Sequence, residues 1–244
     1  RERLIAGIGS RGTDGAGSVG TIMKVISYNL RKHRAAGELA ALVDEHDPDI
    51  LCLQECDVPE LPDRIGGLVL ADATQGNRLG LALFYRESTY RLLGIRTLGL
   101  KKSLHDRIAK PAHERVLGAR LRDIDDGGEF IVASFHAAPL TALNSLRRHQ
   151  IRAALAELAT LGEGLPQLMV GDYNYPVFKE NLGQAVRDQG YALSLSDDHT
   201  YTRYRVFRGH YDFATSSGFE IERITTLPQR SSDHRPILVT VRPN

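Results

Sequence analysis

The chain has 244 residues, 42% of them hydrophobic, which is enough for one large domain with an ample core. Lys and Arg (31) nearly balance Asp and Glu (30), so the net charge of +1 excludes a global attraction to nucleic acid or acidic membranes. No apolar run approaches the length of a membrane-spanning helix, and we expect a soluble protein.

Residues 1–22 are rich in Gly, with Ser, Thr and Asp between the glycines. They have no long apolar core of a secretory signal, and no Gly-Lys-Ser/Thr that would make a phosphate-binding loop. The pattern changes at Met23, directly before the first predicted strand. We expect a flexible leader or a cloning remnant over 1–22, and a single domain over 23–244.

The rest of the chain alternates short apolar runs with a few amphipathic segments. The runs predict strands at 24–30, 49–54, 79–85, 115–122, 129–135, 167–170, 211–215, 221–226 and 236–241. Helices are predicted at 37–46, 144–161 and 178–188. In the second, Leu146, Ile151 and Leu155 recur at helical spacing, and Arg147 and Arg148 are placed on other faces. Many strands and few helices favour an α/β sandwich over a doubly wound sheet.

The two cysteines flank the Leu-Gln-Glu segment of the second predicted strand. In an extended segment Cys52 and Cys56 lie about 13 Å apart, which is too far for a disulfide. Two cysteines without further ligands do not make a zinc site. We therefore expect buried free thiols, and these fit a cytoplasmic location.

Polar residues stand at the ends of the predicted strands, where sheet-built enzymes gather their functional groups. They are Asn29, Glu55, His136, Asp172, Asn174, Asp212, Asp233 and His234. Carboxylates hold hard divalent cations, while imidazoles exchange protons with water or contact phosphate. This combination predicts a metal-assisted phosphoester site.

The segments that carry these residues resemble those of the endonuclease/exonuclease/phosphatase superfamily, the metal-dependent phosphoesterases that include deoxyribonuclease I. They are Ile26-Ser-Tyr-Asn-Leu30, Leu53-Gln-Glu-Cys56, Ala133-Ser-Phe-His136, Val170-Gly-Asp-Tyr-Asn174, His210-Tyr-Asp212 and Ser232-Asp-His234. The resemblance runs from Lys24 to about Val241. It implies a four-layered α/β sandwich with two central mixed β-sheets flanked by helices. It also implies in-line attack of water on phosphorus, with Mg²⁺, or Mn²⁺ as an alternative, neutralising the developing charge.

The resemblance assigns metal binding to Glu55, with Asp233 completing the metal shell and Asn29 orienting ligands beside them. Asp172 and Asn174 stand two apart, so in an extended segment both point to one face. The carboxylate then orients or deprotonates the attacking water, and the amide donates to phosphate oxygens or to a second metal.

The two histidines receive different roles. By resemblance, His136 stabilises the scissile phosphate or protonates the leaving group. Asp212 hydrogen-bonds the terminal His234, which fixes its tautomer and stabilises its imidazolium form.

Three observations bear on the substrate. Arg31 stands where many superfamily members have an acid, which suggests a single metal or a phosphate contact. Asp57, two positions past Glu55, would repel a DNA backbone. The basic and aromatic stretch 200–208 could bind phosphates and stack on a base, or be a solvated strand edge. Its candidate substrate-binding residues are Arg203, Tyr204, Arg205 and Arg208.

The leading hypothesis is a Mg²⁺-dependent, nuclease-like phosphodiesterase acting on nucleic acid. The alternative is the same chemistry on a small phosphorylated metabolite, a lipid head group or a sugar phosphate. A non-catalytic binding module is disfavoured, because it would not need all eight polar positions filled. No protein partner is indicated.

Overall fold

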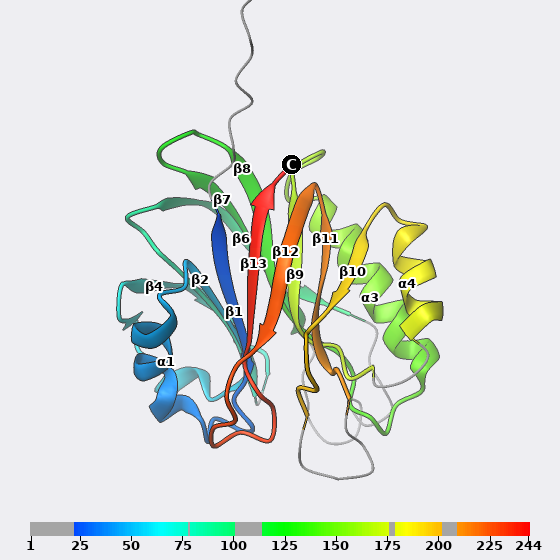
Figure 1. Cartoon of the computed structure of the whole chain (residues 1–244), viewed down its shortest axis with the longest axis horizontal. Helices are drawn as coiled ribbons and strands as arrows, with labels where there is room; N and C mark the ends of the chain where they lie inside the picture. Colours follow the sequence, from blue (N-terminus) through cyan, green and yellow to red (C-terminus); the bar gives the residue numbers. More distant parts are fainter. Residues whose placement is uncertain (1–21, 78, 101–113, 176–178, 202–208) are drawn as a thin grey trace, which may run out of the picture.

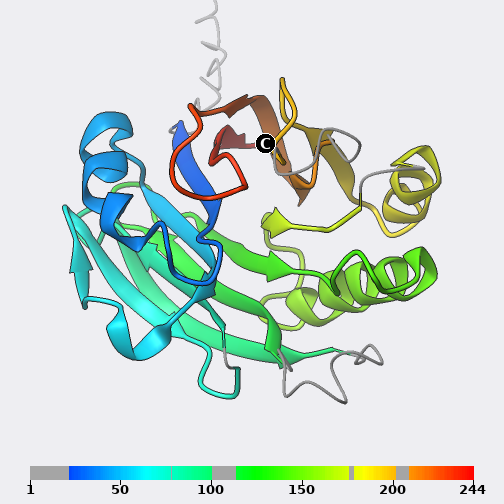
Figure 2. The same ribbon diagram turned by 90° about the horizontal axis from the view of Figure 1, so that it is seen from below.

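Two β-sheets packed face to face, with helices on both outer sides, make up the body of the protein (Figures 1 and 2). The structure, a computed structural model, describes residues 22–77, 79–100, 114–175, 179–201 and 209–244. The predicted leader, residues 1–22, lies outside this part except for its last residue, and it stays a prediction. No helix in the described ranges is long and apolar enough to cross a membrane.

The first sheet has seven strands among the described residues. Their order is β12 (Phe219–Thr226), β13 (Ile237–Pro243), β1 (Met23–Asn29), β2 (Ile50–Cys56), β5 (Gly80–Tyr85), β4 (Leu68–Ala73) and β3 (Arg64–Ile65). Strands β1 and β2 are parallel, and the other pairs are antiparallel, so the sheet is mixed.

The second sheet has six strands within the described ranges. Their order is β10 (Ala192–Leu195), β11 (Asp212–Ser217), β9 (Gln167–Asp172), β8 (Glu129–His136), β7 (Glu114–Asp123) and β6 (Tyr90–Gly99). Here β8 and β9 are the parallel pair. Each sheet therefore carries one parallel pair near its middle, and both strands of such a pair end at the same edge.

Helix α1 (Leu39–His46), after the short 3₁₀ turn η1 (Ala36–Glu38), covers the first sheet, while α3 (Asn144–Ala159) and α4 (Lys179–Arg187) cover the second (Figure 1). A second 3₁₀ turn, η2 (Val58–Glu60), follows β2. Helix α1 ends at His46 and is capped by Asp47, whose left-handed φ of 45° stops the helix directly before Pro48.

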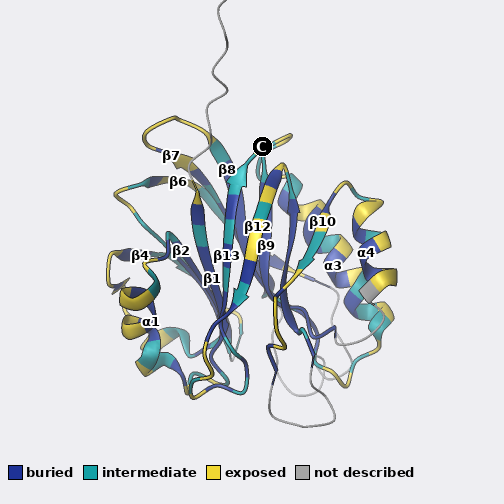
Figure 3. Ribbon diagram, in the orientation of Figure 1, coloured by how far each residue is buried: buried dark blue, intermediate teal, exposed yellow. Residues whose placement is uncertain are grey.

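Three apolar layers fill this architecture. One lies between the two sheets, one between the second sheet and α3 with α4, and one between the first sheet and α1. The strands are mostly buried, whereas the helices expose their outer sides (Figure 3). The predicted four-layered α/β sandwich is confirmed.

The predicted strands and helices all occur, with ends that differ by a few residues. Four of the strands in the described ranges were missed: β3, β4, β6 and β10. In β4 and β6 the pairing register shifts, between Leu70 and Asp72 and between Leu92 and Gly94 respectively. An irregularity of this kind interrupts the alternation of buried and exposed side chains, and with it the period that identifies a strand in a sequence.

Candidate active site

The predicted site residues that the structure describes gather where β1, β8 and β9 end, at one edge of the sandwich, which is the lower edge in Figure 1 and the near face in Figure 2. Strand pairing explains the grouping. Asn29 lies opposite Gln54 in the first sheet, and Asp172 lies opposite both His136 and Asp212 in the second. The sheets are joined here by a side-chain hydrogen bond, in which Asn29 Nδ2 donates to Asp172 Oδ2 at 3.1 Å.

Asp172 is the hub of the cluster. Its Oδ2 accepts from the Asn29 amide and, at 3.2 Å, from Asn174 Nδ2, while Oδ1 accepts from the Asn174 backbone N–H at 2.9 Å. The Nε2 atoms of His136 and His234 lie 3.6 and 3.7 Å from the same Oδ2. The carboxylate is buried, and burial raises the pKa of Asp172 to about 7, against the lowering effect of His234.

His234 is held in one orientation. Its Nδ1 donates to Asp212 Oδ2 at 2.8 Å, so Nε2 faces Asp172. The backbone N–H of His234 donates to Ser232 Oγ, whose hydroxyl donates to the carbonyl of Asn29 at 2.6 Å. Burial alone lowers the pKa of His234, but the carboxylates led by Asp212 and Asp172 outweigh it and raise the pKa to about 10. His234 therefore carries its proton at neutral pH.

Left-handed backbone shapes the loops around this cluster. Arg31, Lys32 and His33 have φ of 48°, 55° and 66°, and Glu55 has φ of 56°. Such angles are uncommon outside glycine and cluster at functional sites. The turn brings the Lys32 N–H to Glu55 Oε2 at 2.8 Å. Glu55 lies near enough to Asp172 for its charge to raise the pKa of that residue.

Asn174 reaches the site by a different route from the predicted one. An extended segment would point Asp172 and Asn174 to the same side, but Asn174 has φ of 48° and lies beyond the end of β9. Its backbone therefore turns back, and its amide contacts Asp172 from one side. Asparagine tolerates this left-handed conformation, so the residue type agrees with the turn.

Arg31 and Asp233 contact each other, with Arg31 Nε 3.5 Å from Asp233 Oδ2. The predicted phosphate contact and the predicted metal ligand are thus neighbours at the rim of the cluster. The other predicted substrate-binding residues, Arg203, Tyr204, Arg205 and Arg208, lie outside the described residues.

Arg147 was predicted on a face of its helix other than that of the apolar residues, and this was wrong. Arg147 is only 4% exposed. Its guanidinium donates to the carbonyl of Pro139 at 2.7 Å and also contacts Asn144. Burial lowers its pKa, while the nearby charge of Asp172 acts in the opposite direction. The signal was in the sequence, because Arg147, Ile151 and Leu155 follow one another at a spacing of four residues.

Two further polar features were not anticipated. Gln54 is buried between the sheets and donates to the hydroxyls of Ser27 (3.2 Å) and Ser134 (3.0 Å), which fixes the sheets directly beneath Glu55. The hydroxyl of Tyr211 is buried and has no hydrogen-bond partner among the described residues. Burial and then Asp172 raise its pKa, so this hydroxyl lies within the influence of the cluster.

Residues 26–234 match the model of the Endonuclease/Exonuclease/phosphatase family. The chain belongs to this family. Its members are phosphoester hydrolases, generally dependent on a divalent metal, and this chain is accordingly a hydrolase of phosphoester bonds.

Among curated relatives of this family member, "Protein angel" of Drosophila melanogaster is 28% identical over 176 residues, which is 64% of this chain and 46% of the relative. The chain therefore spans about half the length of that protein. Solved structures share the fold at low identity. The mannosyl-6-phosphatase Bt3783 of Bacteroides thetaiotaomicron has a TM-score of 0.71 at 20% identity, covering 90% of this chain and 99% of that one. TDP2 of D. rerio, complexed with a single-strand DNA product, has a TM-score of 0.74 at 15% identity, with coverages of 91% and 99%.

The donor set fits the divalent metal that the family generally uses. Glu55, Asp172, Asp212 and Asp233 place four carboxylates in or beside the cluster, and oxygen ligands suit a hard cation. Asp212 Oδ1 is buried and has no hydrogen-bond partner in the described part of the chain. Asp172, Asp212 and His234 also offer ligand atoms within 4.8 Å of one another. A 2.8 Å hydrogen bond between Asp212 and His234 already occupies one of the ligand atoms of each.

Proposed function

We propose that this chain is a Mg²⁺-dependent phosphodiesterase that hydrolyses nucleic acid in a nuclease-like manner. The observation that carries the proposal is the position of Asp172, held by two amides with two imidazoles 3.6 and 3.7 Å from one of its oxygens. A carboxylate fixed in this way can orient a water molecule, and the imidazoles beside it can meet the oxygens of a phosphate.

In this assignment Asp172 orients the attacking water and accepts its proton. A pKa near 7 suits that role, because a base is most effective when its pKa lies close to the working pH. Asn29 and Asn174 hold the carboxylate through their amides, so their first role is positioning. Asn174 can turn its second N–H toward a phosphate oxygen.

In this assignment the two histidines contact the phosphate of the substrate. His234, protonated through its contact with Asp212, presents a cationic Nε2–H to the charge that develops on the phosphoryl oxygens. His136 stands on the other side of Asp172 and stabilises the phosphate or protonates the leaving oxygen. Arg31 is half-buried at the rim and adds a second cationic contact.

Glu55 and Asp233 would hold the metal, with Asn29 beside them. Glu55 presents one oxygen to the Lys32 N–H, which leaves its other oxygen for a cation. Bound Mg²⁺, or Mn²⁺, would supply a Lewis acid that neutralises the charge of the phosphate.

Nucleic acid is the proposed substrate because of the stretch 200–208, in which Arg203, Arg205 and Arg208 are interleaved with aromatics such as Tyr204. The structural relationship to TDP2 with its single-strand DNA product agrees with this choice. A small phosphorylated substrate is the second candidate. It is favoured by the acid at Asp57, by the near-neutral net charge and by the similarity to a mannosyl-6-phosphatase.

The test compares wild type with His234→Ala at fixed Mg²⁺, with EDTA controls, on single- and double-stranded DNA, RNA, bis-p-nitrophenyl phosphate and several phosphomonoesters. His199→Ala is the matched control, because the side chain of His199 is 52% exposed and lies outside the cluster. Cleavage of nucleic acid that needs both metal and His234 supports the nuclease assignment. Turnover confined to phosphomonoesters would replace it with the second candidate.

A further inference from the structure

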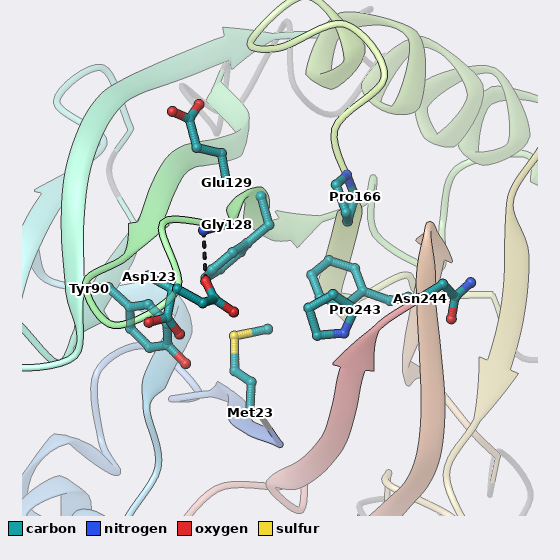
Figure 4. A pocket seen from close by; sticks show the side chains of 11 residues that line it. Met23, Tyr90, Asp123, Gly128, Glu129, Pro166, Pro243 and Asn244 are labelled. Atoms are coloured by element: carbon teal, nitrogen blue, oxygen red, sulfur yellow. Dashed lines mark hydrogen bonds between the residues drawn. The ribbon is translucent and has the colours of Figure 1, made fainter. Parts of the chain in front are cut away.

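A cavity of about 200 Å³ opens between the two sheets at the edge opposite the candidate active site (Figure 4). Its lining includes the first residue of β1, Met23, the first of β8, Glu129, and Pro166 just before β9. These strands end at Asn29, His136 and Asp172. With a rise of about 3.3 Å per residue, the cavity lies roughly 20 Å from the catalytic cluster.

The walls of the cavity are mostly apolar and partly aromatic. Phe130 meets Tyr90 edge-on, with ring centroids 5.3 Å apart, and meets Phe219 in the same manner at 5.9 Å. Met23 lies between the side formed by Tyr90 and the side formed by two prolines (Figure 4). A cavity of about 150 Å³ with such a lining accommodates benzene, so this one accommodates a slightly larger group.

Two carboxylates and one hydroxyl give the cavity a polar side. Asp123 and Asp126 each use one oxygen to accept a backbone N–H of their own turn, and neither makes an ion pair with a described residue. Glu129 differs, since it pairs with Arg120 and Arg122, and its carboxylate points away from Met23 (Figure 4).

Tyr90 is 3% exposed, and its hydroxyl makes no hydrogen bond within the described ranges. Figure 4 shows this hydroxyl directed toward Met23, on the same side as Asp123. Burial raises the pKa of Tyr90, and the charges of Asp49, Asp123 and Asp126 raise it further. The Tyr90 hydroxyl therefore lines the cavity beside carboxylates and offers a lone pair to a donor on a bound molecule.

We propose that this cavity binds a small organic cation, an ammonium group attached to an alkyl or aryl body about the size of benzene. The body contacts Met23, Phe130 and Phe219, and the ammonium group donates to Asp123 and to the Tyr90 hydroxyl, with Asp126 at the rim. Aromatic rings and carboxylates together favour a cation over a neutral molecule of the same shape.

The full chain provides a direct readout, because it contains only two methionines. Met23 lines the cavity, whereas Met169 is buried between β9 and the helices. With ¹³C-methyl methionine, each residue gives one NMR signal, assigned through Met23→Leu and Met169→Leu. Titration with benzylamine is expected to shift the Met23 methyl saturably and to leave Met169 unchanged.

Charge selectivity is tested with benzyl alcohol, a neutral molecule of nearly the same shape, and with Asp123→Asn. Both changes are expected to weaken binding by about fivefold or more. Asp125→Asn is the matched control, because Asp125 belongs to the same turn but does not line the cavity. The proposal is overturned if Met23 shows no saturable shift, if benzyl alcohol binds as well as benzylamine, or if Asp125→Asn weakens binding as much as Asp123→Asn.

Discussion

At the edge where β1, β8 and β9 end, carboxylates contact imidazole and amide groups, whereas at the edge where these strands begin, carboxylates stand beside aromatic rings. Asp172 has two amide donors and two imidazoles around it. Asp123 accepts a hydrogen bond from a backbone N–H and lies near Tyr90. One edge carries a network of hydrogen bonds and ion pairs between polar side chains, and the other has a cavity of about 200 Å³.

The backbone differs between the two edges as well. Among the described residues, the active-site edge has five left-handed residues other than glycine, Arg31, Lys32, His33, Glu55 and Asn174, and the opposite edge has Asp47, which caps α1. The turn beside the cavity reaches its left-handed angle at Gly127, where it carries little strain. Strained backbone persists only where contacts around it hold it in place. Here the Arg31 N–H donates to Asn29 Oδ1 and the Lys32 N–H donates to Glu55 Oε2. The same strands therefore lead into strained, hydrogen-bonded backbone at one end and into a cavity beside a glycine turn at the other.

The largest effect is expected from His234→Ala. It removes the cationic Nε2–H beside Asp172 and leaves Asp212 buried without its partner. We expect kcat on bis-p-nitrophenyl phosphate to fall about 10³-fold. Circular dichroism and Tm measurements separate this loss from unfolding. An activity within about threefold of His199→Ala would contradict the role given to His234.

Gly171→Ala tests how closely the active-site edge is packed. A Cβ at Gly171 would lie 1.9 Å from the carbonyl oxygen of Phe135, on the neighbouring strand β8. The two parallel strands would have to separate, and the free energy of unfolding is expected to fall by at least about 3 kcal/mol. Gly94→Ala in β6 is the control, since nothing lies within 4 Å of the added atom. Urea denaturation of both variants measures the difference, and equal stability would refute close packing at this position.

The sequence predicted the strand ends well because an apolar run closed by a polar residue is a local pattern. This is why Asn29, Glu55, His136 and Asp172 were found together. Contacts between two segments that are far apart in the sequence leave no such local pattern, so the sequence did not predict them. The hydrogen bond from Gln54 to Ser134 crosses between the sheets, and the one from Gln54 to Ser27 joins two strands of the first sheet; neither has a local signature.

Backbone conformation was the second feature that the sequence did not predict. Asn29 contacts Asp172 through a hydrogen bond to the other sheet, and Asn174 contacts it from a left-handed turn. Both side chains reach Asp172, but neither arrangement follows from the spacing of residues along an extended strand. Arg147 is a different case. The spacing of four residues to Ile151 was visible in the sequence, but Arg147 was assigned to the wrong face of the helix.

The substitution Tyr211→Phe tests whether the buried hydroxyl of Tyr211 contributes to catalysis or to stability. The Tyr211 hydroxyl is buried and has no partner among the described residues, so its removal is expected to leave stability unchanged or to raise it by up to about 1 kcal/mol. If that hydroxyl donates to the phosphate, kcat/KM falls about tenfold, which corresponds to about 1.4 kcal/mol. Steady-state kinetics and urea denaturation of the same preparation test both expectations. A stability loss with unchanged kinetics would mean that the hydroxyl has only a structural role.

The smallest catalytic effect is expected from the double substitution Asp123→Asn with Asp126→Asn, at the opposite edge. It removes two negative charges from the cavity without changing the shape of either side chain. These charges lie roughly 20 Å from Asp172, which is more than two Debye lengths at physiological ionic strength. We therefore expect kcat and KM on bis-p-nitrophenyl phosphate to stay within about twofold of wild type. A change larger than about fivefold would show that the strands transmit events at the cavity to the reaction centre. The two edges would then have to be treated as one coupled system, because the charges themselves are too far apart to account for such a change directly.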